Sequence, residues 1–171
     1  LAQKILQKAE AEDTLDVGCC VEIPDSYFIG ADVFYDFQLI NGFSRYMNQK
    51  YRSCEEIEAD YPHIRQAYIE GHFPGEIIFS LGRVLERVGR APLIVRSSSL
   101  LEVHFGAALA GKYESVFCPN QGTPEENLAA LLNAVARVYA STLSPDALLY
   151  RQRMGLVDYD ERMAVLIQKV E

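Results

Sequence analysis

Residues 92–115 read Pro-Leu-Ile-Val-Arg-Ser-Ser-Ser-Leu-Leu-Glu-Val-His-Phe-Gly-Ala-Ala-Leu-Ala-Gly-Lys-Tyr-Glu-Ser, and this stretch joins an apolar strand to a candidate anion site. Residues 93–95 have the pattern of a buried strand. Arg96, which follows them, carries a permanent planar cation that can hold phosphate oxygens from two sides. Three serine hydroxyls come next, and residues 107–111, which are alanine or glycine except for Leu109, leave little side-chain bulk, so the backbone can approach an anion closely. The stretch therefore predicts a strand that leads into a phosphate or nucleotide site.

Two other interpretations of this stretch bear on the site. An arginine at a strand end often forms a structural ion pair, and Glu102 is a nearby acid, so the residues alone leave both roles of Arg96 open. Residues 106–113 nearly match the Gly-x4-Gly-Lys-Ser/Thr phosphate-binding loop, but Tyr113 stands where a magnesium-holding hydroxyl is needed. That loop also requires a helix after the lysine, whereas residues 112–117 alternate like a strand. We therefore expect a different kind of phosphate site.

The composition favours a folded domain and excludes several classes of protein. With 171 residues, 49% of them hydrophobic and 23% charged, the chain suits one domain, or a lobe of a larger one, with a substantial core. Its net charge of −8 argues against a broad nucleic-acid surface, and no apolar run reaches the length of a membrane span. Neither the four cysteines nor the three histidines have metal-ligand spacing. We expect reduced thiols, no metal site and a cytoplasmic protein.

The pattern on either side of this stretch mixes helices and strands without strict alternation, which predicts an α+β fold. Ser-x-x-Glu at residues 53–56 and Thr-Pro-Glu-Glu at 123–126 are capping boxes that open helices, and Pro62 is expected to interrupt the first of these. The expected helices cover residues 1–12, 32–40, 63–70, 75–89, 124–139 and 145–154, and the expected strands cover 19–23, 27–29, 92–97, 113–117 and 163–170. The aromatic series Tyr27, Phe28, Phe34, Tyr35 and Phe37 is expected to pack in the core.

Both ends of the chain look like cuts within a longer polypeptide. The sequence begins with Leu-Ala-Gln-Lys-Ile-Leu, without an initiator methionine and already in helical rhythm, and its last residues have the pattern of a strand. Natural domain edges are usually polar and flexible. We therefore expect residues 1–171 to be a single partial domain.

In combination, the motifs resemble the N-terminal nucleotide-binding region of the phosphoenolpyruvate synthase and pyruvate phosphate dikinase family. That family typically shows Val-Arg-Ser-Ser-Ala, then Glu-Asp, then Ser-Phe-Ala-Gly-Gln-x-x-Thr. The counterparts here are Val95-Arg96-Ser97-Ser98-Ser99, Glu102-Val103 and Ala108-Leu109-Ala110-Gly111-Lys112-Tyr113-Glu114-Ser115. Similarities to Val-Pro-x-Gly-Phe-Val, Tyr-Arg-x-x-x-Gly and Val-x-Val-Gln-x-Met-Val lie at residues 23–29, 150–155 and 163–170. The ordered matches span most of the chain.

The resemblance implies a lobe of an ATP-grasp domain, with mixed helices and a mainly antiparallel sheet, in a phosphotransferase that needs ATP and Mg²⁺. In the family, ATP phosphorylates a histidine on a separate carrier domain, which relays the phosphoryl group to pyruvate and gives phosphoenolpyruvate. Carried over by position, Arg96 would hold ATP phosphates, and Gly111 and Ser115 would line the phosphate loop. Gln168, with the backbone that follows it, would meet the adenine or ribose. The implied partners are ATP and the phosphohistidine carrier and pyruvate-binding domains of the same polypeptide.

The chain also departs from the family pattern. Val103 replaces an expected aspartate, and Ser115 replaces a threonine but keeps the hydroxyl. The family's Gly-Gly-Lys would precede residue 1, and its magnesium-binding acids would follow residue 171. We therefore expect no catalytic residue or metal ligand in this chain and no activity of the chain alone. Two alternatives remain open: a non-catalytic nucleotide-binding or docking module, and a related dikinase whose acceptor is a glucan or an antibiotic.

Overall fold

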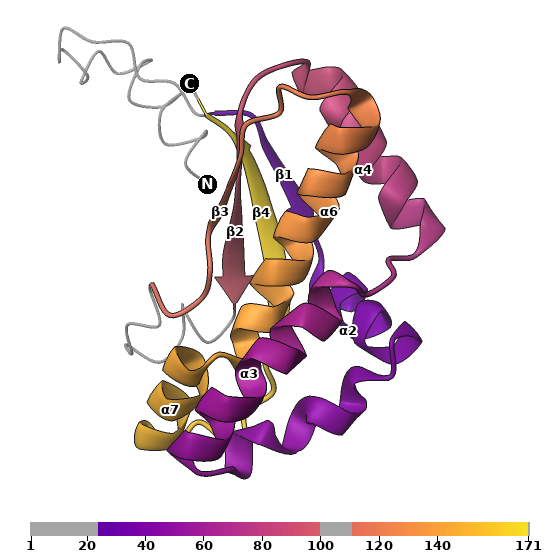
Figure 1. Cartoon of the computed structure of the whole chain (residues 1–171). Coiled ribbons are helices and arrows are strands. Elements are labelled where there is room, and N and C mark those ends of the chain that lie inside the picture. The colour runs from indigo at the N-terminus through magenta and orange to yellow at the C-terminus, as the bar shows by residue number, and fades with distance from the viewer. Residues whose placement is uncertain (1–23, 100–110, 171) are drawn as a thin grey trace, which may run out of the picture.

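The computed structural model describes residues 24–99 and 111–170, which form strands and helices in mixed order (Figure 1). The strands are β1 Ser26–Ile29, β2 Leu93–Ser99, β3 Val116–Cys118 and β4 Met163–Lys169. The α-helices are α2 Ala31–Ile40, α3 Cys54–Ile69, α4 Gly75–Val88, α6 Pro124–Ala140 and α7 Pro145–Arg153, and the 3-10 helices are η1 Phe43–Tyr51 and η2 Ser141–Leu143. None of the described helices is long and apolar enough to cross a membrane.

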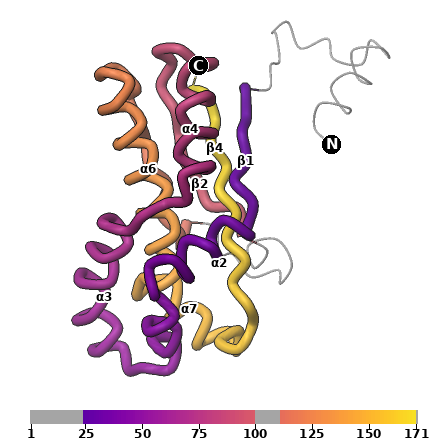
Figure 2. The backbone as a smooth tube through the Cα atoms, turned by 90° about the vertical axis from the view of Figure 1, so that its right-hand side faces the viewer, coloured from indigo at the N-terminus to yellow at the C-terminus, as the bar shows by residue number. Residues whose placement is uncertain are grey.

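The strands form one antiparallel sheet in the order β1-β4-β2-β3. Figures 1 and 2 show α6 and α4 on one side of this sheet and α2, α3 and α7 gathered near its end. No helix of the described part covers the opposite side, which we call the open face. By strand alternation its residues are Ser26, Phe28, Ile94, Arg96, Ser98, Phe117, Ala164, Leu166 and Gln168. The predicted α+β fold with a mainly antiparallel sheet is confirmed.

Side chains at the helix ends explain where the helices begin, and both predicted capping boxes are present. The Thr123 hydroxyl accepts a hydrogen bond from the Glu126 amide at 3.2 Å, and the Glu126 carboxylate accepts one from the Thr123 amide at 2.8 Å. Ser53 and Glu56 form the same reciprocal pair at the start of α3. These contacts satisfy amides that have no partner within the first helical turn.

Helix α3 differs from the expectation because it continues through Pro62 instead of being interrupted there. The inner side of the helix carries Ile57, Ile64 and Tyr68, which are all buried, whereas Pro62 is exposed. Burial on both sides of the proline therefore offsets the backbone hydrogen bond that proline cannot make.

Strand β3 also differs, because it begins at Val116 instead of residue 113. The side chains of Tyr113 and Glu114 bind groups outside the sheet, as described below, and this holds their backbone in a turn. The expected helix at 1–12 and the expected strand at 19–23 lie outside the described residues.

The core lies between the inner side of the sheet and the helices, and α6 supplies much of it through buried residues from Leu131 to Ala140. An aromatic cluster joins α2, η1, α3 and α6, with Phe43 and Tyr68 stacked at a centroid distance of 4.4 Å. The expected aromatic packing is correct for Phe34 and Phe37, which are buried. It is wrong for Phe28, which is 71% exposed because it lies on the open face.

Two buried tyrosines provide a test of this core. Tyr139 and Tyr68 are fully buried, and Tyr68 accepts a hydrogen bond from Gln38 at 3.4 Å, whereas the Tyr139 hydroxyl has no partner among the described residues. We expect Tyr139→Phe to raise the free energy of unfolding by about 1 kcal/mol at pH 7, because it removes an unpaired buried hydroxyl. Tyr68→Phe is the matched control, and it should show no such gain.

The two buried tyrosines also predict how the free energy of unfolding changes at alkaline pH. Burial raises the pKa of both phenols, so each stays protonated in the folded protein above pH 10, where an unfolded tyrosine ionises. Stability is therefore intact below pH 10 and falls above it, and each Tyr→Phe change should reduce this fall by up to about 1.4 kcal/mol per pH unit. Urea titrations at pH 7 and above pH 10 measure both effects. A loss of stability in Tyr139→Phe at pH 7 would contradict the account.

Candidate functional site

The open face brings two of the predicted site residues together. Arg96 of β2 pairs with Leu166 of β4, and Gln168 of β4 pairs with Ile94 of β2. Paired residues in an antiparallel sheet point to the same side, so Arg96 and Gln168 share the open face as diagonal neighbours, with backbones about 7–8 Å apart. Arg96 is exposed and Gln168 is half-buried. The two side chains can therefore contact different parts of one ligand.

Ser115 lies beside Arg96, which is the middle residue of β2 and not its end, because β2 continues to Ser99. Strand β3 pairs Val116 with Val95, and Ser115 is the residue just before this ladder. Continuing the antiparallel register by one residue puts Ser115 beside Arg96, and its side chain is exposed. Gly111 lies in the preceding turn with a φ of +80°, a conformation that favours glycine. The arginine and the hydroxyl thus lie side by side on the open face, and the turn precedes the hydroxyl in the chain.

The turn before Ser115 is held by contacts on two sides. The Tyr113 hydroxyl donates a 2.6 Å hydrogen bond to Glu161 Oε2 in a buried environment. The next residue, Glu114, accepts a hydrogen bond from Arg137 Nε at 2.9 Å and lies 3.4 Å from the Arg65 guanidinium. The partners belong to different elements, because Glu161 precedes β4 whereas Arg137 and Arg65 lie on α6 and α3, and together they hold the backbone that leads to Ser115.

Glu161 is the centre of a buried polar cluster that the sequence did not indicate. Its carboxylate lies 3.5 Å from the Arg151 guanidinium, and the two side chains are only 7% and 5% exposed. Ser99, at the end of β2, hydrogen bonds to the other carboxylate oxygen. Burial, followed by the Glu161 charge, raises the pKa of Tyr113, so its hydroxyl stays protonated and donates. The cluster therefore joins α7, the ends of β2 and β4, and the turn before Ser115.

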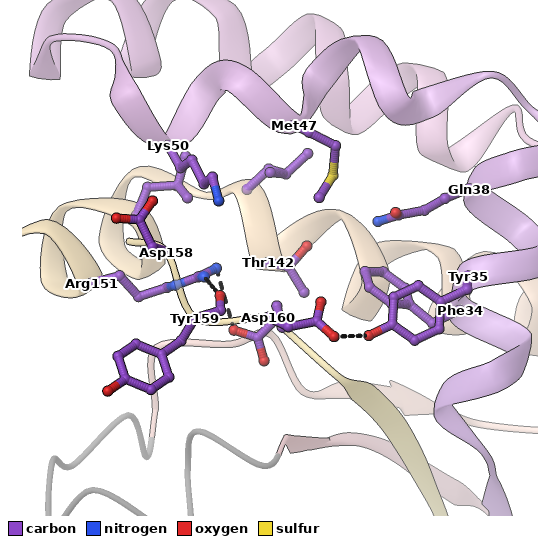
Figure 3. Close-up of a pocket in the computed structure, with 13 residues that line it drawn as sticks. Phe34, Tyr35, Gln38, Met47, Lys50, Thr142, Arg151, Asp158, Tyr159 and Asp160 are labelled. Carbon is purple, nitrogen blue, oxygen red and sulfur yellow. Dashed lines mark hydrogen bonds and ion pairs between the residues drawn. The ribbon is translucent and has the colours of Figure 1, made fainter. Parts of the chain in front are cut away.

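A small cavity lies on the helical side of this cluster (Figure 3). It has a volume of about 190 Å³ and is lined by residues of α2, η1, η2 and α7 and by residues 158–161. The Tyr35 hydroxyl donates a 2.7 Å hydrogen bond to Asp160 at its edge, and burial together with this carboxylate raises the pKa of Tyr35 to about 12. Arg151 and Glu161 line both the cavity and the cluster. None of the four predicted site residues lines this cavity.

The chemistry of the open face fits a nucleotide better than a metal. Arg96 can pair with phosphate oxygens, Ser115 can donate a hydroxyl, and Gln168 offers an amide. Phe28, 71% exposed, and Phe117, 56% exposed, add apolar surface that a base or ribose could cover. Within residues 24–99 and 111–170, no group of three or more His, Cys, Asp or Glu side chains could hold a metal ion. Magnesium therefore has no ligand cluster in the described part.

The structure bears on two sequence predictions for this region: the type of phosphate loop after Gly106 and the ion pair of Arg96. The described residues after Lys112 form a turn and then β3, not a helix, which agrees with the exclusion of a Gly-x4-Gly-Lys-Ser/Thr loop. Glu102, the acid that could pair with Arg96, lies outside the described residues, as does Val103. Within residues 24–99 and 111–170 no acid forms a salt bridge with Arg96.

Comparison with known proteins identifies the family. Residues 4–171 match the family described as "Pyruvate phosphate dikinase, AMP/ATP-binding domain". The chain belongs to this family. A rifampicin phosphotransferase of Streptomyces sviceus is 33% identical over 108 residues, which cover 63% of this chain and 12% of the relative. As a member of the pyruvate phosphate dikinase AMP/ATP-binding family, the chain is an ATP-binding domain of that family, and the resemblance seen in its motifs is confirmed.

Breaking the buried ion pair of this cluster should lower the free energy of unfolding much more than breaking a neighbouring exposed ion pair. We expect Glu161→Gln to lower the free energy of unfolding by about 3 kcal/mol, because it leaves the buried Arg151 cation without its counter-ion. Arg162→Gln is the matched control, since its pair with Asp160 at 3.3 Å is more than half exposed, and it should cost less than about 1 kcal/mol. Urea unfolding followed by circular dichroism measures both. Equal losses in the two variants would contradict the structural role of Glu161.

Proposed function

We propose that Arg96, Gly111, Ser115 and Gln168 bind ATP within a phosphotransferase that phosphorylates a carrier histidine and then pyruvate, giving phosphoenolpyruvate. The family supports ATP as the ligand. The observation that carries the residue assignment is the presence of Arg96 and Gln168 on one open sheet face, with Ser115 beside Arg96 in register. The proposal treats residues 1–171 as one lobe of an ATP-grasp domain.

The arrangement suggests how the nucleotide lies. Arg96 at the middle of β2, Ser115 beside it and the turn at Gly111 that precedes Ser115 supply the groups that suit phosphate. Gln168 lies two residues further along the paired strands, and Ile94 and Leu166 lie between as apolar surface. The triphosphate would therefore lie over Arg96 and the base over Gln168. Phosphoryl transfer depends mainly on charge neutralisation and alignment, which is what such residues can supply.

The remaining parts of the reaction are assigned to residues outside this region. We propose that the enzyme uses Mg²⁺, although the described residues contain no cluster suited to it. The histidine carrier and the pyruvate-binding domain are proposed to belong to the same polypeptide, and the aligned region covers 12% of the rifampicin phosphotransferase. The chain alone is then expected to bind ATP without turnover. Its cytoplasmic location stays a prediction.

The role of Arg96 can be measured directly. We expect Arg96→Ala to raise the dissociation constant for ATP by about 10- to 100-fold, because it removes charge-assisted hydrogen bonds to phosphate. Arg83→Ala, which changes an exposed arginine on α4 away from the open face, should leave ATP binding unchanged. Isothermal titration calorimetry on the full-length polypeptide gives both constants. Unchanged affinity in Arg96→Ala would remove this residue from the site.

A second candidate function keeps ATP but changes the acceptor. The observation in its favour is the similarity to a protein named rifampicin phosphotransferase, whose acceptor is an antibiotic. Incubating the full-length polypeptide with ATP, Mg²⁺ and pyruvate, rifampicin or a glucan, with ³¹P NMR detection, separates the possibilities. We expect phosphoenolpyruvate. Phosphorylated rifampicin or glucan would support the alternative acceptor, and ATP binding without any product would support a non-catalytic module.

A further inference from the structure

A short relay of hydrogen bonds fixes the orientation of the Gln168 side chain. Ser26 of β1 and Gln168 of β4 are direct cross-strand partners on the open face. The Ser26 hydroxyl donates to the Pro24 carbonyl oxygen at 2.9 Å, and Gln168 Nε2 donates to Ser26 Oγ at 3.2 Å. All three residues are half-buried. The relay therefore links the backbone before β1 to the amide that is proposed to meet the base.

The direction of this relay follows from the chemistry of its members. A carbonyl oxygen only accepts hydrogen bonds, so Ser26 must give Pro24 its single hydroxyl proton. Ser26 Oγ can then only accept, so Gln168 must turn its NH₂ group toward Ser26. The opposite orientation would bring two acceptors together. The amide nitrogen of Gln168 therefore faces Ser26, and its oxygen faces away from Ser26.

Gln168 Oε1 is consequently left as an acceptor. No described residue donates a hydrogen bond to it, and the cross-strand partner on its other side is Ile94, which has no polar side-chain atom. A ligand on the open face thus meets a carbonyl oxygen at this position. The NH₂ group is already engaged and cannot serve the ligand without breaking the relay.

We propose that Ser26 is a positioning residue that makes the site select adenine nucleotides over 6-oxopurine nucleotides. Adenine carries an N6 amine that donates, whereas guanine and hypoxanthine carry an O6 atom that accepts. With Oε1 turned to the base, Gln168 can accept from N6 but faces an acceptor in a 6-oxopurine. The inference rests on the proposed function, because it requires the base to lie at Gln168.

The test compares ATP with ITP, whose hypoxanthine base replaces the N6 amine with O6. We expect the wild-type full-length polypeptide to bind ATP about tenfold more tightly than ITP. This is the change in dissociation constant expected when one hydrogen bond between the base and a polar group is lost. Ser26→Ala removes the contact that orients the Gln168 amide, so the amide can rotate by about 180° and offer its NH₂ group to O6 of ITP. The ratio of the dissociation constant for ITP to that for ATP should then fall toward one. Ser26→Thr keeps the hydroxyl and should keep the ratio. Ser44→Ala, an exposed serine of η1, is the control for serine loss elsewhere.

A double variant makes the test independent of folding effects at Ser26. A glutamate carboxylate at pH 7 only accepts, whichever way it turns. Ser26→Ala combined with Gln168→Glu should therefore restore the preference for ATP that Ser26→Ala alone loses. Restoration supports the relay even if the overall affinity is lower in both variants.

The outcomes distinguish this inference from the proposed function. A wild-type ratio near one, or a ratio unchanged by Ser26→Ala, overturns the role of Ser26. If Arg96→Ala weakens both nucleotides equally in that case, the nucleotide site itself stands. If the wild type binds neither nucleotide, the proposed function fails and this inference fails with it.

Discussion

The buried pair of Arg151 and Glu161 determines the geometry of the open face, although neither residue lies on it. Two ions removed from water cost several kcal/mol each unless close partners satisfy them. Here Glu161 receives the Tyr113 hydroxyl and contacts Ser99, while Arg151 also donates to the Tyr159 carbonyl at 2.7 Å. Because these partners come from β2, from the turn before β3 and from the segment before β4, satisfying the charges requires all three to meet. The ends of the strands are thereby held in one arrangement.

A sheet covered on one side only leaves the other side available for a ligand. Antiparallel sheets tolerate this because alternate residues point to opposite faces. On β4 the inner residues Met163, Val165 and Ile167 are fully buried, whereas the outer residues Leu166 and Gln168 are half-buried. The inner residues supply the burial that stabilises the strand. The outer positions are therefore free to carry a cation, an amide and apolar surface suited to binding.

Local signals in the sequence predicted much of the fold, and non-local contacts account for what they missed. Thr123 begins α6 through a capping box that four consecutive residues specify, so its position was predictable. Strand alternation likewise predicts that Arg96 and Val95 point to opposite sides. Glu161 was missed because its hydrogen-bond partner Tyr113 lies 48 residues earlier and no spacing rule connects them. The continuation of α3 through Pro62 was missed for the same reason, since it depends on burial by other elements.

The turn before Ser115 separates residues that hold it from residues that face the ligand. In the family pattern Ala-Gly-Gln-x-x-Thr, the two unspecified positions correspond to Tyr113 and Glu114, and these are the side chains that bind Glu161 and Arg137. Two of the specified positions correspond to Gly111 and Ser115, which lie at the turn and just before the β3 ladder. A serine in place of threonine keeps the hydroxyl while the neighbouring anchors fix its backbone. The phosphate side of the proposed site thus depends on side chains that hold the turn from outside the open face.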